Sequence, residues 1–366
     1  MRITKVELYD VRYTAAGAPF VMSGGKVVSD LEGVVLKLHT DEGVVGWGEQ
    51  TPFPSYMAAH VDGAREALRV LGPAVVGADP RDVKRVQLLM RKALKGHHYA
   101  RSAIDLACWD VLGKAADMPV AHLLGGVLQA SFPVIRAIGI DTPDAMRAAA
   151  AAFAEEGYSR VQVKLGDDWR LDVERARACL TELADVETVV FDANTNWRKD
   201  QAVRVVTELG GRRYVEQPCR TVDECLQVRE RTGCLLILDE TMCRGREIWS
   251  TLAGQAPDAA MLKLSRFGGI TPLRQVRDFC EEMGVPVIIE DGGAGDVLAA
   301  ASAQLAASTQ PEWLFSGSLT NVFVKERLSA VAPRHEAGRG TLPAGPGLGL
   351  GEVDEDLLGT PVAAIE

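Results

Sequence analysis

Carboxylate side chains recur in the middle of the chain at regular intervals, each at the end of a short apolar run. Asp192, Glu216 and Asp239 are separated by 216 − 192 = 24 and 239 − 216 = 23 residues, the length of one strand-and-helix unit in a parallel barrel. Adjacent strands lie about 5 Å apart, so three such carboxylates can converge on one point. Unpartnered, they would repel one another and take up protons, whereas Mg²⁺ prefers oxygen ligands and would hold them together. The spacing predicts a magnesium site.

Two lysines flank these carboxylates. Lys164 ends the apolar run before them and Lys263 lies in the run after them, so the two amines should approach from opposite sides. A neutral lysine could remove the α-proton of a bound carboxylate substrate while the metal stabilises the enediolate. Alternatively, either lysine could form a salt bridge with Glu240 or Asp291, or form a Schiff base, although an aldolase would not need three carboxylates.

The elements that position these residues are eight short strands with helical patterns, such as 172–183 and 222–232, between them. Strands that are apolar on both faces and alternate with helices indicate a parallel sheet covered by helices. A doubly wound open sheet is the alternative fold, but such a sheet normally carries a glycine-rich phosphate-binding turn after its first strand, and no G-x-G-x-x-G follows the first strand here. The sequence therefore favours a barrel of the triosephosphate isomerase type. The predicted strands are 133–138, 160–165, 188–192, 213–216, 235–239, 260–264, 286–290 and 313–315.

The first 130 residues show a different pattern. Alternating residues at 3–9 predict a strand, and the runs 34–39 and 44–49 around Asp41-Glu42-Gly43 predict a hairpin. Amphipathic helices are expected near 61–72 and 81–95, and a buried helix over 99–116. We therefore predict an α+β domain over 1–130, the barrel over 131–325, and a Gly- and Pro-rich tail over 326–366 that packs back on the first domain.

Composition excludes several classes of protein. The 366 residues include 40 Lys+Arg and 50 Asp+Glu, a net charge of −10 that argues against nucleic acid as a partner. No apolar stretch is long enough to span a membrane. Seven cysteines without a C-x-x-C pair are typical of reduced thiols in a cytoplasmic protein, and the six histidines show no metal-binding spacing. We expect a cytoplasmic protein that acts on a small molecule, with neither nucleic acid nor a membrane as partner.

Several segments together resemble the enolase superfamily, in its muconate-lactonizing-enzyme-like subgroup, over nearly the whole chain. The resemblance implies an N-terminal α+β capping domain and a modified (β/α)₇β TIM-type barrel. It also implies Mg²⁺ bound by Asp192, Glu216 and Asp239, Lys164 and Lys263 as the acid/base pair, and a homo-oligomer, either a dimer or an octamer. The matching segments are 41–49, 103–110, 123–126, 163–166, 191–194, 215–218, 238–241 and 263–270.

Two positions refine this resemblance. The seventh strand ends Ile289-Glu290-Asp291-Gly292-Gly293 without histidine, which disfavours the mandelate-racemase subgroup. The family's second strand usually reads Lys-x-Lys, where this chain has Gln162-Val163-Lys164. The missing cation would leave Lys164 with a higher pKa and leaves the direction of proton transfer open. Gln162, Glu240 and Asp291 are expected around the reacting groups, and Asn194 is expected to donate to a carboxylate or to the substrate.

Substrate choice in this family lies in two loops of the capping domain, here roughly Thr14–Ser29 and Gln50–His60. Their segments at 23–25, 51–53 and 58–60 are similar to the branch that dehydrates cis-3-hydroxy-L-proline to Δ¹-pyrroline-2-carboxylate. This implies a dehydratase, with 2-epimerisation by the same lysine pair, and substrate contacts from Tyr56 and Thr320.

Alternatives remain open. One is a racemase or epimerase of another amino acid, an N-acyl amino acid, a betaine or a dipeptide, although dipeptide epimerases usually carry Asp-x-Asp where this chain has Ser316-Gly317-Ser318. Another is a muconate-type cycloisomerase, although the capping loops offer few cations beyond Lys26 for a second substrate carboxylate. A metal-stabilised barrel without catalytic activity is the alternative from a different class.

Overall fold

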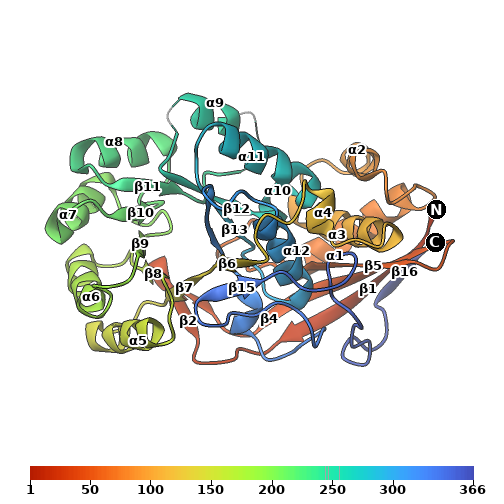
Figure 1. The fold of residues 1–366 in the computed structure, drawn as a ribbon, viewed down its shortest axis with the longest axis horizontal. Coiled ribbons are helices and arrows are strands. Elements are labelled where there is room, and N and C mark those ends of the chain that lie inside the picture. Colours follow the sequence, from red (N-terminus) through yellow and green to blue (C-terminus); the bar gives the residue numbers. More distant parts are fainter. Residues whose placement is uncertain (244, 246, 255) are drawn as a thin grey trace.

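Eight parallel strands form a nearly closed barrel beside an N-terminal α+β region in the computed structural model, which describes residues 1–243, 245, 247–254 and 256–366 (Figure 1). Each strand pairs with the next in sequence, and the parallel bridge between Val134 and Gly317 brings the last strand to the first. The eight predicted strands are thus confirmed. They are β7 (Ile135–Ile138), β8 (Arg160–Lys164), β9 (Thr188–Asp192), β10 (Tyr214–Glu216), β11 (Leu235–Leu238), β12 (Ala259–Lys263), β13 (Val287–Glu290) and β14 (Leu314–Gly317).

Helices cover the outside of the barrel between successive strands. After β14 the chain forms only the short 3₁₀ helix η2 (Thr320–Phe323), so the barrel has the predicted (β/α)₇β form. Side chains such as Val190, Ile237 and Ile288 form a separate apolar cluster with residues of the other strands, as expected for inward-facing positions. The helices are α5 (Pro143–Glu155), α6 (Trp169–Glu182), α7 (Lys199–Leu209), α8 (Val222–Thr232), α9 (Glu247–Gly254), the consecutive pair α10 (Leu264–Phe267) and α11 (Ile270–Glu282), and α12 (Asp296–Ala307).

The N-terminal region consists of an antiparallel sheet and three main helices. The sheet has the order β16-β1-β4-β5, and β4 and β5 form the predicted hairpin. α3 is buried along most of its length because it packs on β5 on one side and on α10 of the barrel on another. The elements are β1 (Ile3–Tyr13), β4 (Leu31–Thr40), β5 (Val45–Gln50), α1 (Val61–Val75), α2 (Val83–Ala93), α3 (His98–Ala115) and the short α4 (Val120–Leu123).

Two excursions of the chain tie this region to the barrel. The hairpin of β2 (Phe20–Met22) and β3 (Lys26–Val28) extends to the β7 side of the barrel (Figure 1), where Val21 accepts a backbone hydrogen bond from Ile140. In the C-terminal segment, β15 (Arg339–Thr341) pairs with β6 (Ser131–Pro133), and β16 (Ala363–Ile365) pairs with β1. The segment 326–366 therefore contacts both the barrel and the N-terminal sheet.

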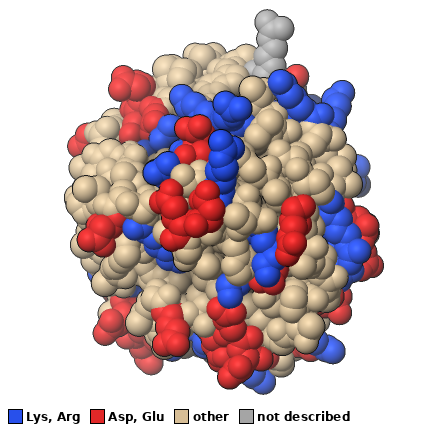
Figure 2. Space-filling view, turned by 90° about the vertical axis from the view of Figure 1, so that its right-hand side faces the viewer, with Lys and Arg blue, Asp and Glu red and all other residues tan. Residues whose placement is uncertain are grey.

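Charged side chains of both signs are intermixed on the face formed by the N-terminal region (Figure 2). Ion pairs such as Arg65–Asp10 and Lys37–Glu355 account for part of this mixture. All seven cysteines are free thiols, and six of them are buried, Cys243 being the exposed one. Within the described residues, no helix is long and apolar enough to cross a membrane.

Candidate functional site

The predicted charged residues meet at the C-terminal end of the barrel. Lys164 lies opposite Asp192 in the pairing of β8 with β9, and Asp192 lies opposite Glu216 in the pairing of β9 with β10. Asp239 follows β11, and Lys263 ends β12. All five side chains are buried. The two lysines thus lie on either side of three carboxylates in the strand order β8 to β12.

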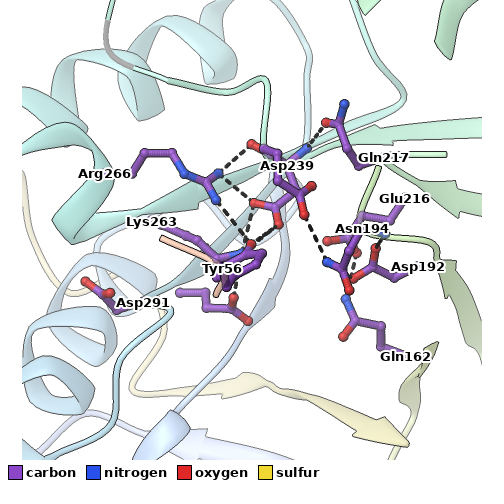
Figure 3. Close-up of polar contacts among 12 residues, drawn as sticks. Tyr56, Gln162, Asp192, Asn194, Glu216, Gln217, Asp239, Lys263, Arg266 and Asp291 are labelled. Atoms are coloured by element: carbon purple, nitrogen blue, oxygen red, sulfur yellow. Dashed lines mark hydrogen bonds and ion pairs between the residues drawn. The ribbon is translucent and has the colours of Figure 1, made fainter. Parts of the chain in front are cut away.

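Asp239 has the largest set of partners (Figure 3). Lys263 Nζ donates to both carboxylate oxygens at 2.9 and 2.8 Å, Arg266 Nη1 donates to Oδ1 at 2.7 Å, and the Tyr56 hydroxyl donates to Oδ2 at 2.6 Å. Burial by itself would raise the pKa of Asp239, but Arg266 and Lys263 outweigh burial and lower this pKa below its ordinary value. The carboxylate of Asp239 is therefore ionised. Tyr56, which donates to this carboxylate, also lines the cavity described below.

Asp192 is held by Lys164 and by Asn194. Lys164 Nζ lies 2.5 Å from Oδ2, and Asn194 donates its backbone N–H to Oδ1 and its side-chain amide to Oδ2 at 2.8 and 3.0 Å. Asn194 and Gln217, each just beyond a strand, have φ values of 42° and 34°. Such left-handed backbone in residues other than glycine is unfavourable and concentrates at functional sites.

Glu216 lacks a partner for one oxygen. Gln162 Nε2 donates to its Oε2 at 2.7 Å, while the buried Oε1 has no hydrogen-bond partner. Burial, followed by the negative charges of Asp192 and Asp239, raises the pKa of Glu216 well above its ordinary value. A buried carboxylate with an unsatisfied oxygen beside two others is the environment that a cation would relieve.

These carboxylates fit a hard divalent cation by their chemistry. Oxygen ligands suit Mg²⁺, and Glu216 Oε1 supplies an unused ligand atom. Among the residues the structure describes, no three His, Cys, Asp or Glu side chains stand ready to hold a metal ion, and Asp192 and Asp239 are each bound to a lysine. To bind a metal ion, Asp192 and Asp239 would therefore have to break their ion pairs with the lysines and coordinate the cation instead.

The lysines do not pair with Glu240 or Asp291, the salt-bridge partners considered from the sequence. Lys164 binds Asp192, and Lys263 binds Asp239 and Glu290, the latter at 2.9 Å. Burial acts to lower the pKa of each lysine, but these carboxylates outweigh burial and raise both pKa values. The alternative was wrong because the strand register places Glu290, and not Asp291, opposite Lys263.

Glu240 and Asp291 occupy supporting positions. Glu240 Oε1 accepts a hydrogen bond from the Asn194 amide at 3.0 Å, and burial together with Asp239 and Asp192 raises its pKa to about 8. Asp291 accepts from the backbone and hydroxyl of Ser265 at 2.8 and 2.7 Å and from the backbone of Gly293. It thereby fixes the loop after β13 to the start of α10.

A cavity of about 360 Å³ opens above the lysines, between the barrel and the N-terminal region. Both predicted specificity loops line it, through residues 15–18 of the first and through Phe53 and Tyr56 of the second. Thr320 also lines the cavity, and its hydroxyl donates to the carbonyl of Gly293. Further lining residues include Gln162, Lys164, Lys263, Glu290, Gly292 and Ser318.

Sequence reasoning missed Arg266 and Glu290 as members of this site. Arg266 follows Lys263 by three residues, a helical spacing that returns it to the same face. Glu290 ends the seventh strand as Lys263 ends the sixth. Both signals were present, but a lone charge at a strand or helix end is more often solvent-exposed.

Two family models match the chain. Residues 3–125 match the mandelate racemase/muconate lactonizing enzyme N-terminal domain, and residues 144–357 match the enolase C-terminal domain-like family.

Similar proteins match most or all of the chain. Cis-3-hydroxy-L-proline dehydratase of Roseibium aggregatum is 36% identical over 99% of both chains. N-succinyl-L-Arg/Lys racemase of Bacillus cereus is 29% identical over 78% of both. A structure of a mandelate racemase/muconate lactonizing enzyme from Roseovarius nubinhibens, complexed with magnesium, superimposes with a TM-score of 0.94 at 34% identity and covers 100% of both chains.

Proposed function

The chain belongs to the mandelate racemase/muconate lactonizing enzyme family of the enolase superfamily, whose members are enzymes, and from this premise we propose that it is a Mg²⁺-dependent enzyme that abstracts the α-proton of a carboxylate substrate. The observation that carries the proposal is the pair of buried lysines on either side of three carboxylates. One amine on each side of a substrate is the arrangement that proton removal and proton return at one carbon require.

Asp192, Glu216 and Asp239 would hold the cation. When bound, Mg²⁺ would stabilise the negative charge that develops on the substrate carboxylate as the α-proton leaves. Lys164 and Lys263 carry raised pKa values while carboxylates face them. Once Asp192 and Asp239 turn to the cation, Lys164 would lose its carboxylate partner and Lys263 would keep Glu290. Burial and the nearby positive charge would then favour the neutral amine, above all at Lys164, and the neutral amine is the form that accepts a proton.

The leading substrate is cis-3-hydroxy-L-proline. One lysine takes the proton from Cα, the electron pair of that C–H bond forms the Cα–Cβ double bond, and the β-hydroxyl leaves as water with a proton from the other lysine. The resulting enamine tautomerises to Δ¹-pyrroline-2-carboxylate. The relative of that activity at 36% identity and the likeness of the capping loops support this choice.

The test is incubation with Mg²⁺ in D₂O, followed by proton NMR of cis-3-hydroxy-L-proline. Trans-4-hydroxy-L-proline, L-proline and L-proline betaine serve as comparison compounds. Loss of the cis-3-hydroxyproline signals with growth of the pyrroline product is expected. If that compound stays intact and unlabelled at Cα under conditions where the protein binds Mg²⁺, the substrate assignment is wrong.

Racemisation or epimerisation is the second candidate. The lysines on both sides of the site would permit protonation of the opposite face of Cα, and a racemase is among the relatives. Deuterium entering Cα of a test compound without elimination would favour this candidate. It would leave the acid/base assignment of the lysines intact.

We also propose that copies of the chain form a homo-oligomer, a dimer or an octamer, as the family resemblance implies. Exposed apolar side chains, among them Val27, Leu128 and Val331, offer surface that association could bury. Light scattering coupled to size-exclusion chromatography tests this, and a mass of one chain would contradict it.

A further inference from the structure

The segment Ser23-Gly24-Gly25 of the first specificity loop has no role in the site described above. It forms the short 3₁₀ helix η1 (Ser23–Gly25) at the tip of the hairpin of β2 and β3. Ser23 is fully buried, yet it is not among the described residues that line the cavity. Contact with a substrate therefore does not account for this buried hydroxyl, and its hydrogen-bond partners have to be sought in the barrel.

The hydroxyl of Ser23 reaches the loop that follows β9. It donates to Asn194 Oδ1 at 3.2 Å, and it also forms a hydrogen bond to the carbonyl of Leu165, so that its single proton is shared between two acceptors. Asn194 in turn donates from Nδ2 to Asp192 and to Glu240, each at 3.0 Å (Figure 3). A continuous series of hydrogen bonds thus runs from the capping hairpin to Asp192.

Glycines allow the two segments to approach closely at this contact. Gly24 donates its backbone N–H to Asp167 Oδ1 at 3.2 Å and has a φ of 69°, a left-handed conformation that glycine adopts readily. Gly166 has a φ of 110°, and a Cβ at this position would lie 2.8 Å from the Cβ of Ser23. The absence of side chains at both glycines therefore brings the Ser23 hydroxyl within reach of Asn194.

Asn194 depends on such contacts for its position. It lies between β9 and α7, and both Asn194 and Thr195 have left-handed backbone, with φ values of 42° and 69°. This conformation is unfavourable in residues other than glycine and persists where the surroundings hold it. Among the described residues that bond to the Asn194 side chain, Ser23 alone comes from the N-terminal region. Loss of its hydroxyl would leave the carbonyl end of the amide unanchored.

We propose that Ser23 is a positioning residue of the metal site, which fixes Asn194 and thereby orients the Asp192 carboxylate for Mg²⁺. The inference rests on the proposed function in assigning Asp192 to the cation, and it adds a residue of the capping hairpin to the support of that site. Groups that orient a metal ligand typically change metal affinity by about 10–100-fold. Ser23 acts through Asn194, so its effect should be smaller, about five- to tenfold, the contribution of about one hydrogen bond.

Isothermal titration with Mg²⁺ in the absence of substrate tests the proposal. Ser23→Ala should bind Mg²⁺ about five- to tenfold more weakly than the native protein, and Ser23→Cys, which keeps a weaker donor, should lose less. Ser329→Ala is the matched control, because Ser329 is also a buried serine that donates to a carbonyl, that of Leu350. It should bind Mg²⁺ as the native protein does. Unchanged affinity in Ser23→Ala would overturn the proposal.

A double-variant cycle separates positioning from a general loss of packing. Asn194→Gly removes the amide and suits the left-handed backbone at this position. It should weaken Mg²⁺ binding by about 10–100-fold, and Ser23→Ala should add little to this loss, because the route from Ser23 to Asp192 is already broken. Fully additive effects of the two changes on the binding free energy would overturn the proposal.

Hydrogen exchange of the native protein gives a readout that needs no variant. If the hairpin supports the metal site, Mg²⁺ must in return stabilise the docked hairpin, because coupling between two sites is reciprocal. Mg²⁺ should therefore slow the exchange of amides in 20–28 more than that of amides in α2, and equal slowing would overturn the proposal. Failure of the native protein to bind Mg²⁺ would overturn the proposed function as well, whereas Mg²⁺ affinity that is independent of Ser23 would overturn this inference alone.

Discussion

Lys164 and Lys263 are each bound to a carboxylate that the family resemblance assigns to the metal. Buried ammonium groups are stable only beside such partners, and both pKa values are raised accordingly. A cation that draws Asp192 and Asp239 away would withdraw these partners and leave Lys263 with Glu290. In the proposed function, the charge state of the lysines, above all of Lys164, would therefore depend on whether the cation is bound. A lysine would act as a base only when the cation is present to stabilise the product of proton removal.

We expect that catalysis requires each of the two lysines, Lys164 and Lys263. Lys164→Ala and Lys263→Ala should each lower kcat by about 10²–10⁴-fold, the contribution typical of a general acid or base. Steady-state kinetics with the substrate established by NMR gives the measurement. Lys84→Ala, an exposed lysine on α2, is the control and should leave kcat unchanged. Full activity in both lysine variants would show that the acid/base assignment is wrong.

Glu216 allows metal binding to be tested without a substrate. Mg²⁺ should raise the melting temperature of the native protein, since a ligand at 100 times its Kd stabilises by about 2.7 kcal/mol. Glu216→Gln should lose most of this response. It should also melt at or above the native protein in EDTA, because an amide stays neutral at a position where burial and the charges of Asp192 and Asp239 disfavour an ionised carboxylate. Glu32→Gln, exposed on β4, is the control, and a full Mg²⁺ response in Glu216→Gln would contradict the ligand assignment.

At the scale of elements, β5 and α12 are joined by a buried carboxylate. Glu49 at the end of β5 accepts from the backbone of Val297 and Leu298 at 3.1 and 3.3 Å, in the first turn of α12, and from the Tyr13 hydroxyl. Burial raises its pKa to about 8 despite these bonds. The capping sheet is thus anchored to the helix that follows the loop of Gly292 and Gly293.

This raised pKa predicts a pH dependence of stability. Between the ordinary pKa of 4.5 and the folded value of about 8, the folded state holds a proton that the unfolded chain has released. The stabilisation is therefore complete below pH 4.5 and is lost as pH rises towards 8. Glu49→Gln should flatten the decline in melting temperature between pH 5 and 8, whereas Glu32→Gln should not. Parallel pH profiles of native protein and Glu49→Gln would contradict the assignment.

The barrel could be predicted from sequence because its signals are local. Each strand is a short apolar run, and the residue at its end projects from the same edge as its neighbours. Lys164, Asp192 and Glu216 are consequently brought together by register alone. The sites of Lys263 and Asp239 followed from the same rule.

Contacts between distant segments could not be predicted in this way. The bond from Tyr56 to Asp239 joins residues 183 positions apart, and its existence depends on how the capping domain sits on the barrel. Arg136 follows the inward-facing Ile135 on β7, where a strand pattern predicts packing against a helix, yet it is among the residues that line the cavity.

At the scale of the whole molecule, α3 connects the capping region to the barrel through buried polar bonds. Trp109 Nε1 donates to the Thr271 hydroxyl at 2.8 Å, and Asp105 accepts from the backbone of Thr271 at 2.9 Å. Thr271 lies in the first turn of α11, whereas Asp105 and Trp109 lie on α3. All three side chains are buried. The two regions should therefore unfold together, because separating them would leave these groups without partners.

Trp109→Phe tests this coupling, since it removes the donor and leaves the Thr271 hydroxyl buried. It should lower the free energy of unfolding by about 1–3 kcal/mol, the cost of one unsatisfied buried group plus lost packing. Thr271→Val removes the other partner, and the double variant should be less destabilised than the sum of the two, because neither donor nor acceptor is then left unpaired. Denaturant unfolding followed by tryptophan fluorescence and by circular dichroism should give one coincident transition for the native protein. Two separate transitions, or strictly additive effects, would show that the capping region and the barrel are held together by other contacts.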